Sequence, residues 1–233
     1  MKVKIFSDVR CPFCYIGQHK FEAALRQFAH ADQVEVVWKS FELDPGLQTV
    51  PELKTLDHLA RGKGISRQEA EQMTQYVVQA AAEVDLTFNF DQAVVANSFQ
   101  AHRLIQLGKD KGVASAVEEQ LFQAQFIKGQ NIDDRAVLIE VGGAAGLEEQ
   151  TVEQMLSSDA YATAVRQDEA EAQSLGVRGV PFFVFNDKYA VSGAQPVATF
   201  LGALEQSWRE FRKENDLIVL EDGSSCSVDG PCD

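Results

Sequence analysis

Cysteine is absent from most of the chain. The 233 residues include four cysteines, and none of them lies between Cys14 and Cys226. A secreted disulfide scaffold spreads its cysteines along a short chain, so this distribution excludes that class. A chain of this length also buries enough apolar surface to fold without disulfide or metal cross-links. The pairs Cys11/Cys14 and Cys226/Cys232 therefore need another explanation.

Positive charge and long apolar runs are scarce as well. Lys and Arg number 21 against 35 Asp and Glu, which gives a net charge of −14. Phosphate binding needs a cationic face, so we expect neither nucleic acid nor an anionic membrane as a partner. No segment approaches the roughly 18 apolar residues that span a bilayer. The first residues lack the apolar core of a signal peptide, which leads us to expect a cytoplasmic protein.

The first 45 residues read as strand, helix and strand. Residues 3–9 and 34–43 are rich in β-branched and aromatic side chains, whereas residues 12–30 repeat apolar positions at steps of three and four. Because about 20 residues connect the two strands, we expect them to be parallel.

The middle of the chain is helical in character. Residues 53–175 contain no proline and are rich in Ala, Gln, Glu and Leu, which are good helix formers. A capping box at Ser66–Glu69 predicts the start of one helix. The expected helices are 66–84, 97–108, 113–128, 133–143, 147–157 and 159–175.

Strand character returns after Gly176. Residues 180–185 and 189–191 predict a β-hairpin that turns at Asn186-Asp187, and residues 196–211 predict a final helix. The whole pattern predicts an α/β fold in which β-α-β and β-β-α halves are interrupted by an all-helical insertion. We expect the sheet domain at 1–52 and 176–212, the insertion at 53–175 and a C-terminal tail at 213–233.

The Cys11-Pro12-Phe13-Cys14 motif lies where the first strand ends and the first helix begins. A structural zinc site would need a second Cys or His pair at similar spacing, which the sequence does not offer nearby, and we expect no metal. A pair of inert core cysteines is a second interpretation. A redox dithiol is favoured, because unpaired N–H groups and the helix dipole at this point stabilise the thiolate of Cys11. Cys14, one turn later, would then resolve a mixed disulfide.

The two residues between the cysteines influence how strongly oxidising the Cys11–Cys14 disulfide is expected to be. Pro12 and Phe13 offer the Cys11 thiolate neither a hydrogen bond nor a charge. We therefore predict a less stabilised thiolate and a less oxidising disulfide than in relatives that carry a histidine there. We also predict that Pro12 and Phe13 contact the substrate.

Gly179-Val180-Pro181 is the second candidate element of the site. One interpretation is a proline that merely begins a strand. The favoured one, given the CxxC motif, is a cis-proline that faces the dithiol, as in thioredoxin-like folds. It would leave the backbone of Val180 free to pair with an extended substrate.

Four blocks of this sequence resemble the DsbA family, in particular its FrnE-type branch: 11–17, 41–45, 97–104 and 179–184. The segment 191–196 fits as well. The resemblance implies a thioredoxin fold interrupted by a helical domain, and thiol–disulfide oxidoreductase activity. It makes Cys11 the attacking cysteine, Cys14 the resolving cysteine and Pro181 the cis-proline. For His102, two interpretations stay open: a role near the active site and a purely structural role.

Several functional alternatives stay open at this stage. Glutathione-dependent isomerases or transferases of the kappa type look similar but carry serine at the first cysteine position, so Cys11 argues against them. A redox-independent chaperone that binds clients is another alternative. For the leading hypothesis we expect cysteine-containing proteins or small thiols and disulfides as partners, with reductase or isomerase activity in a reducing cytosol. We expect no cofactor beyond the dithiol, glutathione as a candidate reductant, and a monomer or homodimer.

The C-terminal pair is the least constrained feature. Cys226 and Cys232 are separated by five residues that include the turn sequence Asp229-Gly230-Pro231. One hypothesis is a relay in which this auxiliary redox pair exchanges electrons with Cys11 and Cys14. The alternative is a terminal segment with two idle thiols.

Overall fold

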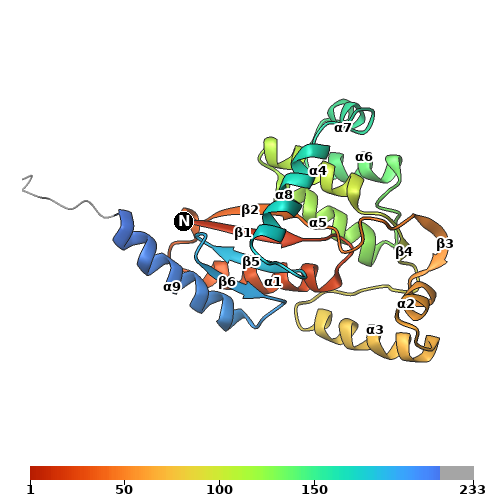
Figure 1. Cartoon of the computed structure of the whole chain (residues 1–233), viewed down its shortest axis with the longest axis horizontal. Coiled ribbons are helices and arrows are strands. Elements are labelled where there is room, and N and C mark those ends of the chain that lie inside the picture. Colours follow the sequence, from red (N-terminus) through yellow and green to blue (C-terminus); the bar gives the residue numbers. More distant parts are fainter. Residues whose placement is uncertain (216–233) are drawn as a thin grey trace, which may run out of the picture.

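A four-stranded mixed sheet forms the centre of the molecule (Figure 1). The computed structural model describes residues 1–215, apart from the side chains of Lys54, Glu214 and Asn215. The strand order is β2-β1-β5-β6. The strands are β1 (Lys2–Ser7), β2 (Glu35–Ser40), β5 (Phe182–Phe185) and β6 (Tyr189–Ser192). Strands β1 and β2 are parallel, which confirms the prediction from the length of their connection, and β5 is antiparallel to both β1 and β6.

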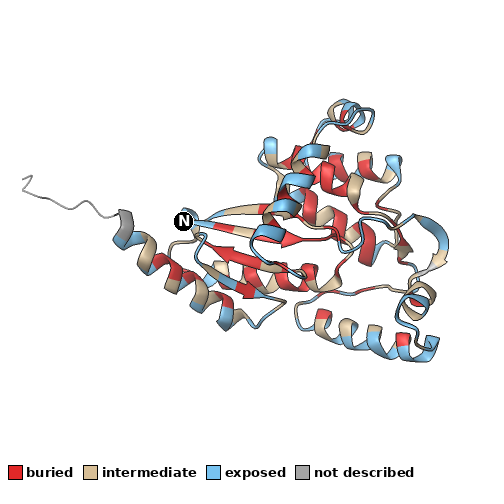
Figure 2. Cartoon of the chain, viewed as in Figure 1, coloured by how far each residue is buried: buried red, intermediate tan, exposed pale blue. Residues whose placement is uncertain are grey.

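Side chains alternate between the two faces of this sheet. Ile5 lies opposite Phe183 in the pairing of β1 with β5, and both belong to the main apolar core. Phe6 and Val184 point to the other face, where they meet Ala172. The central strands β1 and β5 are therefore mostly buried, whereas the edge strands β2 and β6 are mostly intermediate or exposed (Figure 2).

Two helices cover one face of the sheet. Helices α1 (Pro12–Gln27) and α9 (Val197–Asn215) pack side by side below it in Figure 1. Phe21 of α1 and Phe200 of α9 meet Phe183, with ring centroids 5.5 and 4.6 Å from the Phe183 ring. Helix α9 runs to Asn215, so residues 213–215, which we predicted to be tail, are helical. The rest of that predicted tail lies outside the described residues.

The segment between β2 and β5 is mainly helical, as predicted, but it also contains two short strands. Residues 50–54 and 94–95 form a small antiparallel sheet, and a helix lies directly after the first of these strands. The sequence pattern predicted none of these three elements. The elements are β3 (Val50–Lys54), α2 (Thr55–Lys63), α3 (Arg67–Ala82), β4 (Val94–Val95), α4 (Phe99–Asp110), α5 (Ala114–Phe122), the π-helix η2 (Gln123–Ile127), α6 (Arg135–Ala144), α7 (Glu149–Leu156) and α8 (Ala162–Ser174); a short 3-10 turn, η1 (Ala31–Gln33), precedes β2.

Local signals explain several helix and turn boundaries. The predicted capping box at the start of α3 is present: the Ser66 side chain accepts from the backbone N–H of Glu69, whose carboxylate accepts from the N–H of Ser66. The hairpin between β5 and β6 turns at Asn186 and Asp187, both with positive φ. Asn and Asp tolerate that conformation better than other non-glycine residues, which confirms the prediction.

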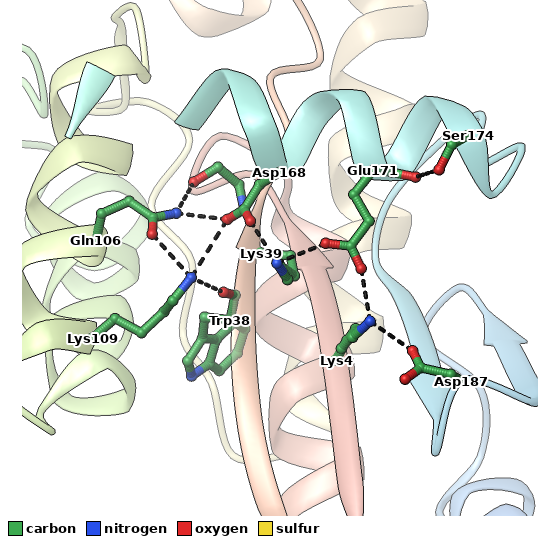
Figure 3. Close-up of polar contacts among 10 residues, drawn as sticks. Lys4, Trp38, Lys39, Gln106, Lys109, Asp168, Glu171, Ser174 and Asp187 are labelled. Atoms are coloured by element: carbon green, nitrogen blue, oxygen red, sulfur yellow. Dashed lines mark hydrogen bonds and ion pairs between the residues drawn. The ribbon is translucent and has the colours of Figure 1, made fainter. Parts of the chain in front are cut away.

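A buried acidic residue joins the insertion to the sheet. Asp168 of α8 accepts hydrogen bonds from Lys39 Nζ at 2.7 Å and from the backbone N–H of Ser40 at 3.1 Å, both in β2. Gln106 of α4 donates to the same carboxylate at 2.6 Å (Figure 3). Glu171, one turn further along α8, accepts from Lys4 of β1. Helices α4 and α8 are thus fixed against β2 and its neighbour β1, whose carboxyl end leads to the CxxC motif. Within the described part of the chain, no helix is long and apolar enough to cross a membrane.

Candidate functional site

The CxxC motif lies at the N-terminus of α1, immediately after the turn that follows β1. Cys11 is the N-cap residue, with extended backbone (φ −92°, ψ 110°), and Pro12 is in the first turn. The backbone N–H of Cys11 donates to Asp8 O at 2.9 Å, and the N–H of Cys14 donates to Cys11 O at 3.0 Å. The helix dipole is positive here, and the early N–H groups of a helix have no intrahelical partner. This is the environment that the sequence predicted for Cys11.

The loop before β5 faces this motif. The Val180–Pro181 peptide bond is cis, as predicted. The Sγ atom of Cys11 lies 3.5 Å from Val180 O. The carbonyl of Pro181 is held by the N–H of Gly193, at 2.8 Å, just after β6. The structure therefore brings Cys11, Val180 and Pro181 together, although 169 positions separate Cys11 from Val180.

Gly17 allows this close approach. A Cβ atom at position 17 would lie 2.9 Å from Cγ of Pro181 and 3.5 Å from Ala194. Position 17 is buried inside α1, where glycine otherwise costs helix stability relative to alanine. The small residue is thus explained by contact with the cis-proline loop.

Gly17→Ala is expected to lower the free energy of unfolding by about 1–3 kcal/mol, because the extra methyl group overpacks this contact. Displacement of Pro181 should also reduce any exchange activity at Cys11. The matched control is Gly202→Ala in α9, where nothing lies within 4 Å of the added atom. That variant should be unchanged or up to about 1 kcal/mol more stable. Urea unfolding of both variants checks the pair, and equal stabilities would contradict our account of Gly17.

Cys14 differs sharply from Cys11 in its surroundings. It is 2% exposed and faces the interior. Burial raises the pKa of Cys14 well above its usual value, and contact with Cys11 raises it further. Hydrogen bonds from the Asp8 backbone and the Ser7 side chain act in the opposite direction. Cys14 is therefore held as a thiol, beside groups that can hydrogen-bond to its thiolate.

A buried polar cluster lies behind Cys14, and we define it as Ser7, Asp8, His102 and Glu118. The Ser7 hydroxyl donates to Glu118 Oε1 at 2.7 Å, and His102 Nε2 lies 3.6 Å from Asp8 Oδ1. Asp8 also accepts from the backbone N–H groups of Arg10, at 3.1 Å, and Leu43, at 2.8 Å. All four side chains are at most 2% exposed. Such a cluster is costly to bury unless its charges are matched.

Charge in the buried polar cluster is shared between the Asp8–His102 pair and a protonatable carboxyl group. Burial acts to raise the pKa of Asp8, but the facing imidazole and the backbone N–H groups of Leu43 and Arg10 together lower that pKa. Burial acts to lower the pKa of His102, but Asp8, Glu118 and Glu42 together raise it. Burial raises the pKa of Glu118 to about 7, in spite of the hydrogen bond from Ser7. Near neutral pH, Glu118 can therefore gain or release a proton.

Glu118 should make the stability of the protein depend on pH. Its pKa is about 7 in the folded protein, against an ordinary value of 4.5. The contribution of Glu118 to the free energy of unfolding is therefore fully present below about pH 4.5. It is lost as the pH rises through 7, and the whole loss is about 3 kcal/mol. His102, whose pKa is also raised, acts with the same sign from its ordinary value upward.

The wild-type protein should lose free energy of unfolding between pH 4.5 and pH 7.5. In Glu118→Gln we expect that decrease to be smaller by about 3 kcal/mol, because the amide does not titrate. Urea unfolding at pH 4.5, 6 and 7.5 measures it. The exposed Glu149→Gln variant serves as control and should follow the wild type. A Glu118→Gln profile parallel to the wild type would show that Glu118 is ionised in the folded protein throughout.

Some members of the site were not predictable from the residue pattern. His102 is fully buried against Asp8, which places it near the motif, within the buried polar cluster. Ser7, Asp8 and Glu118 were missed, and the only available signal was polar residues in otherwise apolar stretches. Among residues 1–215, no group of three or more His, Cys, Asp or Glu is placed to hold a metal ion. Cys226 and Cys232, the predicted auxiliary pair, lie outside the described residues.

This protein has a CxxC motif at a helix N-terminus, next to a cis-proline, in a fold built from β-α-β and β-β-α halves. Thioredoxin-fold disulfide oxidoreductases have this arrangement. The sequence model of the family described as DSBA-like thioredoxin domain matches residues 2–205. The chain therefore belongs to the DsbA-like family of thioredoxin-fold oxidoreductases.

Individual relatives agree with this assignment. A probable DsbA oxidoreductase from Streptomyces coelicolor is 38% identical, with a TM-score of 0.85, and the match covers 100% of this chain and 98% of that one. The uncharacterized protein YwbO of Bacillus subtilis (strain 168) is 27% identical over 79% of this chain and 86% of its own length. The cytosolic disulfide reductase DsbM from Pseudomonas aeruginosa, solved with GSH, shares the fold at 18% identity and a TM-score of 0.60, with 92% and 98% covered.

Proposed function

We propose that this protein is a thiol–disulfide oxidoreductase that exchanges disulfides with cysteine-containing proteins or small thiols through Cys11. The observation that carries the proposal is the position of Cys11 at the N-terminus of α1, with its sulfur 3.5 Å from the carbonyl before the cis-proline. This position places the sulfur at the positive end of the helix dipole and beside a backbone segment that a substrate can pair with.

The proposed reaction in the reducing direction has two steps. The Cys11 thiolate attacks one sulfur of the client disulfide, which forms a mixed disulfide and releases the other client sulfur as a thiolate. Cys14 then loses its proton and attacks Cys11, which releases the client as a dithiol and leaves a Cys11–Cys14 disulfide. Two thiols, for which glutathione is our candidate, reduce that disulfide and are themselves oxidised. Client oxidation follows the same path in reverse.

The second step needs a base for Cys14, whose pKa is raised by burial and by Cys11. Ser7 contacts both Cys14 and Glu118. Its hydroxyl can accept the Cys14 proton while it donates its own proton to the Glu118 carboxylate. The result is a Cys14 thiolate and a protonated Glu118. The pKa of Glu118, about 7, suits a group that must take up this proton and return it.

In this proposal the residues around Cys11 contact the client. Val180 would pair its backbone with an extended client segment, and Pro12 and Phe13 would provide apolar contact. Tyr76 of α3 supports this assignment, because its ring centroid lies 6.5 Å from that of Phe13 and it is 66% exposed. A large exposed aromatic side chain beside a reactive cysteine is suited to hold an apolar part of a client.

We propose reduction or isomerisation as the dominant direction, in the cytoplasm and within a FrnE-type branch of the family. Pro12 and Phe13 add neither a charge nor a side-chain hydrogen bond to a Cys11 thiolate. We therefore predict a reduction potential clearly more negative than the roughly −120 mV of the strongest periplasmic oxidants. Equilibration with glutathione redox buffers measures it, and a potential near −120 mV would contradict the direction. Coupling to Cys226 and Cys232 remains part of this proposal and concerns residues outside the described part of the chain.

The proposal is tested by reduction of insulin with dithiothreitol as electron donor. The wild-type protein should shorten the time to precipitation of the insulin B chain at catalytic concentration. A chaperone without redox activity would instead delay precipitation. A wild type without acceleration, in either reduced or oxidised form, would refute the proposed function.

A further inference from the structure

A half-enclosed pocket of about 460 Å³ lies beside the CxxC motif. Its lining includes Pro12 and Phe13 of α1 together with residues of α2 and α3. Helix α3 is thinly packed, because its only buried residues are Ala70 and Ala81, and Figure 2 shows it mainly exposed or intermediate. The pocket is within the size range of sites for small molecules. It is therefore large enough for a ligand of its own, independent of a protein client.

Most of the surface of this pocket is apolar. Phe13, Met73, Val77, Phe90 and Phe126 line it, and Met73 is 43% exposed in spite of its apolar side chain. Open apolar surface of this kind is unfavourable in water and is typical of ligand sites. The body of a ligand that fits here should be apolar.

Two charged side chains, Arg10 and Lys63, line the pocket, and both are cationic, although the chain as a whole carries a net charge of −14. His58 lines it as well. Within the described part of the chain, none of the three makes an ion pair. The Nη1 atom of Arg10 is shielded from solvent and has no hydrogen-bond partner there. The charge of Arg10 is therefore not matched by an acidic side chain in that part of the chain, and a carboxylate is the partner that fits a guanidinium best.

We infer that this pocket binds an apolar small molecule that carries a carboxylate, with the carboxylate on the Arg10 guanidinium and the apolar body between α2, α3 and Phe13. Lys63 adds positive potential at the same site. This inference goes beyond the proposed function, because binding needs neither thiol. It involves no covalent step.

Three probes with one apolar body and different head groups test the inference: 2-naphthoate, 2-naphthalenemethanol and 2-naphthylmethylamine. Calorimetric titration of the full-length protein should show saturable binding of 2-naphthoate, at least about tenfold tighter than of the neutral alcohol, because a hydrogen bond between two charged groups is stronger than one to a neutral hydroxyl. The amine should bind most weakly. Equal affinity for all three probes, or no saturable binding, would overturn the inference.

Three variants locate the binding. Arg10→Met keeps an apolar stem but removes the guanidinium, so it should lose the preference for 2-naphthoate while its affinity for the alcohol is kept. Arg178→Met, at an exposed position outside the pocket, should bind like the wild type. If Arg10→Met keeps the preference, or Arg178→Met loses it, the assignment to Arg10 is wrong. Val77→Trp should fill the pocket and weaken both probes, and thermal unfolding shows whether that variant is folded.

The Cys11→Ser/Cys14→Ser double variant separates this inference from the proposed function. It should bind 2-naphthoate with wild-type affinity, because neither sulfur lines the pocket. Binding in a protein without exchange activity would refute only the oxidoreductase proposal. Exchange activity without binding would refute only the ligand site.

Discussion

In the insulin assay, the Cys11→Ser variant is expected to fall to the uncatalysed rate. A serine hydroxyl does not ionise appreciably at neutral pH and forms no mixed disulfide, so the first step of the proposed exchange is lost. The substitution changes only one buried atom at the N-cap of α1, and serine is a favourable N-cap residue. Thermal unfolding should therefore show a folded protein.

The matched control is Cys14→Ser, which keeps the attacking sulfur and removes the resolving one. This variant should form a stable mixed disulfide with a client, because Cys11 still attacks and no second thiol releases the product. Non-reducing electrophoresis and intact-mass measurement detect the adduct, and the Cys11→Ser/Cys14→Ser variant should give none. A Cys11→Ser variant with wild-type turnover, or a Cys14→Ser variant that forms no adduct, would assign the chemistry elsewhere.

The parts of the fold that the sequence predicts are those with strong local signals. The β-rich run at β1, the apolar run at β5 and the turn at Asn186 and Asp187 predict the sheet half. The CxxC motif marks the start of α1, and Val180-Pro181 marks the loop that faces it. These features depend on backbone preferences of a few adjacent residues, which a single sequence displays directly.

The parts that were missed depend on contacts between distant residues. Strands β3 and β4 are short and stabilise each other only as a pair, and neither has a pattern of its own. The sequence pattern predicts Glu118 as an ordinary polar residue of a helix. In the structure it is buried and accepts a hydrogen bond from Ser7, which is 111 positions away. Nothing in the local sequence of either residue reveals that contact, because burial of a polar group is decided by the packing of α5 against the end of β1.

The network around Asp168 is a second feature of this kind, and it has the largest expected effect on stability. The Asp168 side chain is 5% exposed and that of Lys39 is 15% exposed. Burial alone would lower the pKa of Lys39, but the hydrogen bonds and charges of Asp168 and Glu171 raise it. Lys109 lies 3.7 Å from the same carboxylate. Removal of Asp168 would take away the carboxylate that pairs with Lys109 and one of the two carboxylates that pair with Lys39 (Figure 3).

Asp168→Ala is therefore expected to lower the free energy of unfolding by about 3–5 kcal/mol, the usual cost of removing one partner from a buried ion pair. For a protein of this size, this corresponds to a Tm lower by roughly 6–20 °C. Asp168→Asn keeps an acceptor for the N–H of Ser40 but loses the charge, so its loss should be smaller. If Asp168→Ala does not fold, the Asn variant still measures the network.

The surface pair Asp57–Arg67 provides the matched control. Its N–O distance is 2.6 Å, comparable with that of Lys39–Asp168, but both side chains are more than a third exposed. Asp57→Ala should therefore cost no more than about 1 kcal/mol. Because Asp168 joins α8 and α4 to β2, its loss should also loosen the insertion against the sheet, and hydrogen exchange should increase in α8 before it increases in α1. Equal effects of Asp168→Ala and Asp57→Ala would mean that the network contributes little beyond an exposed ion pair.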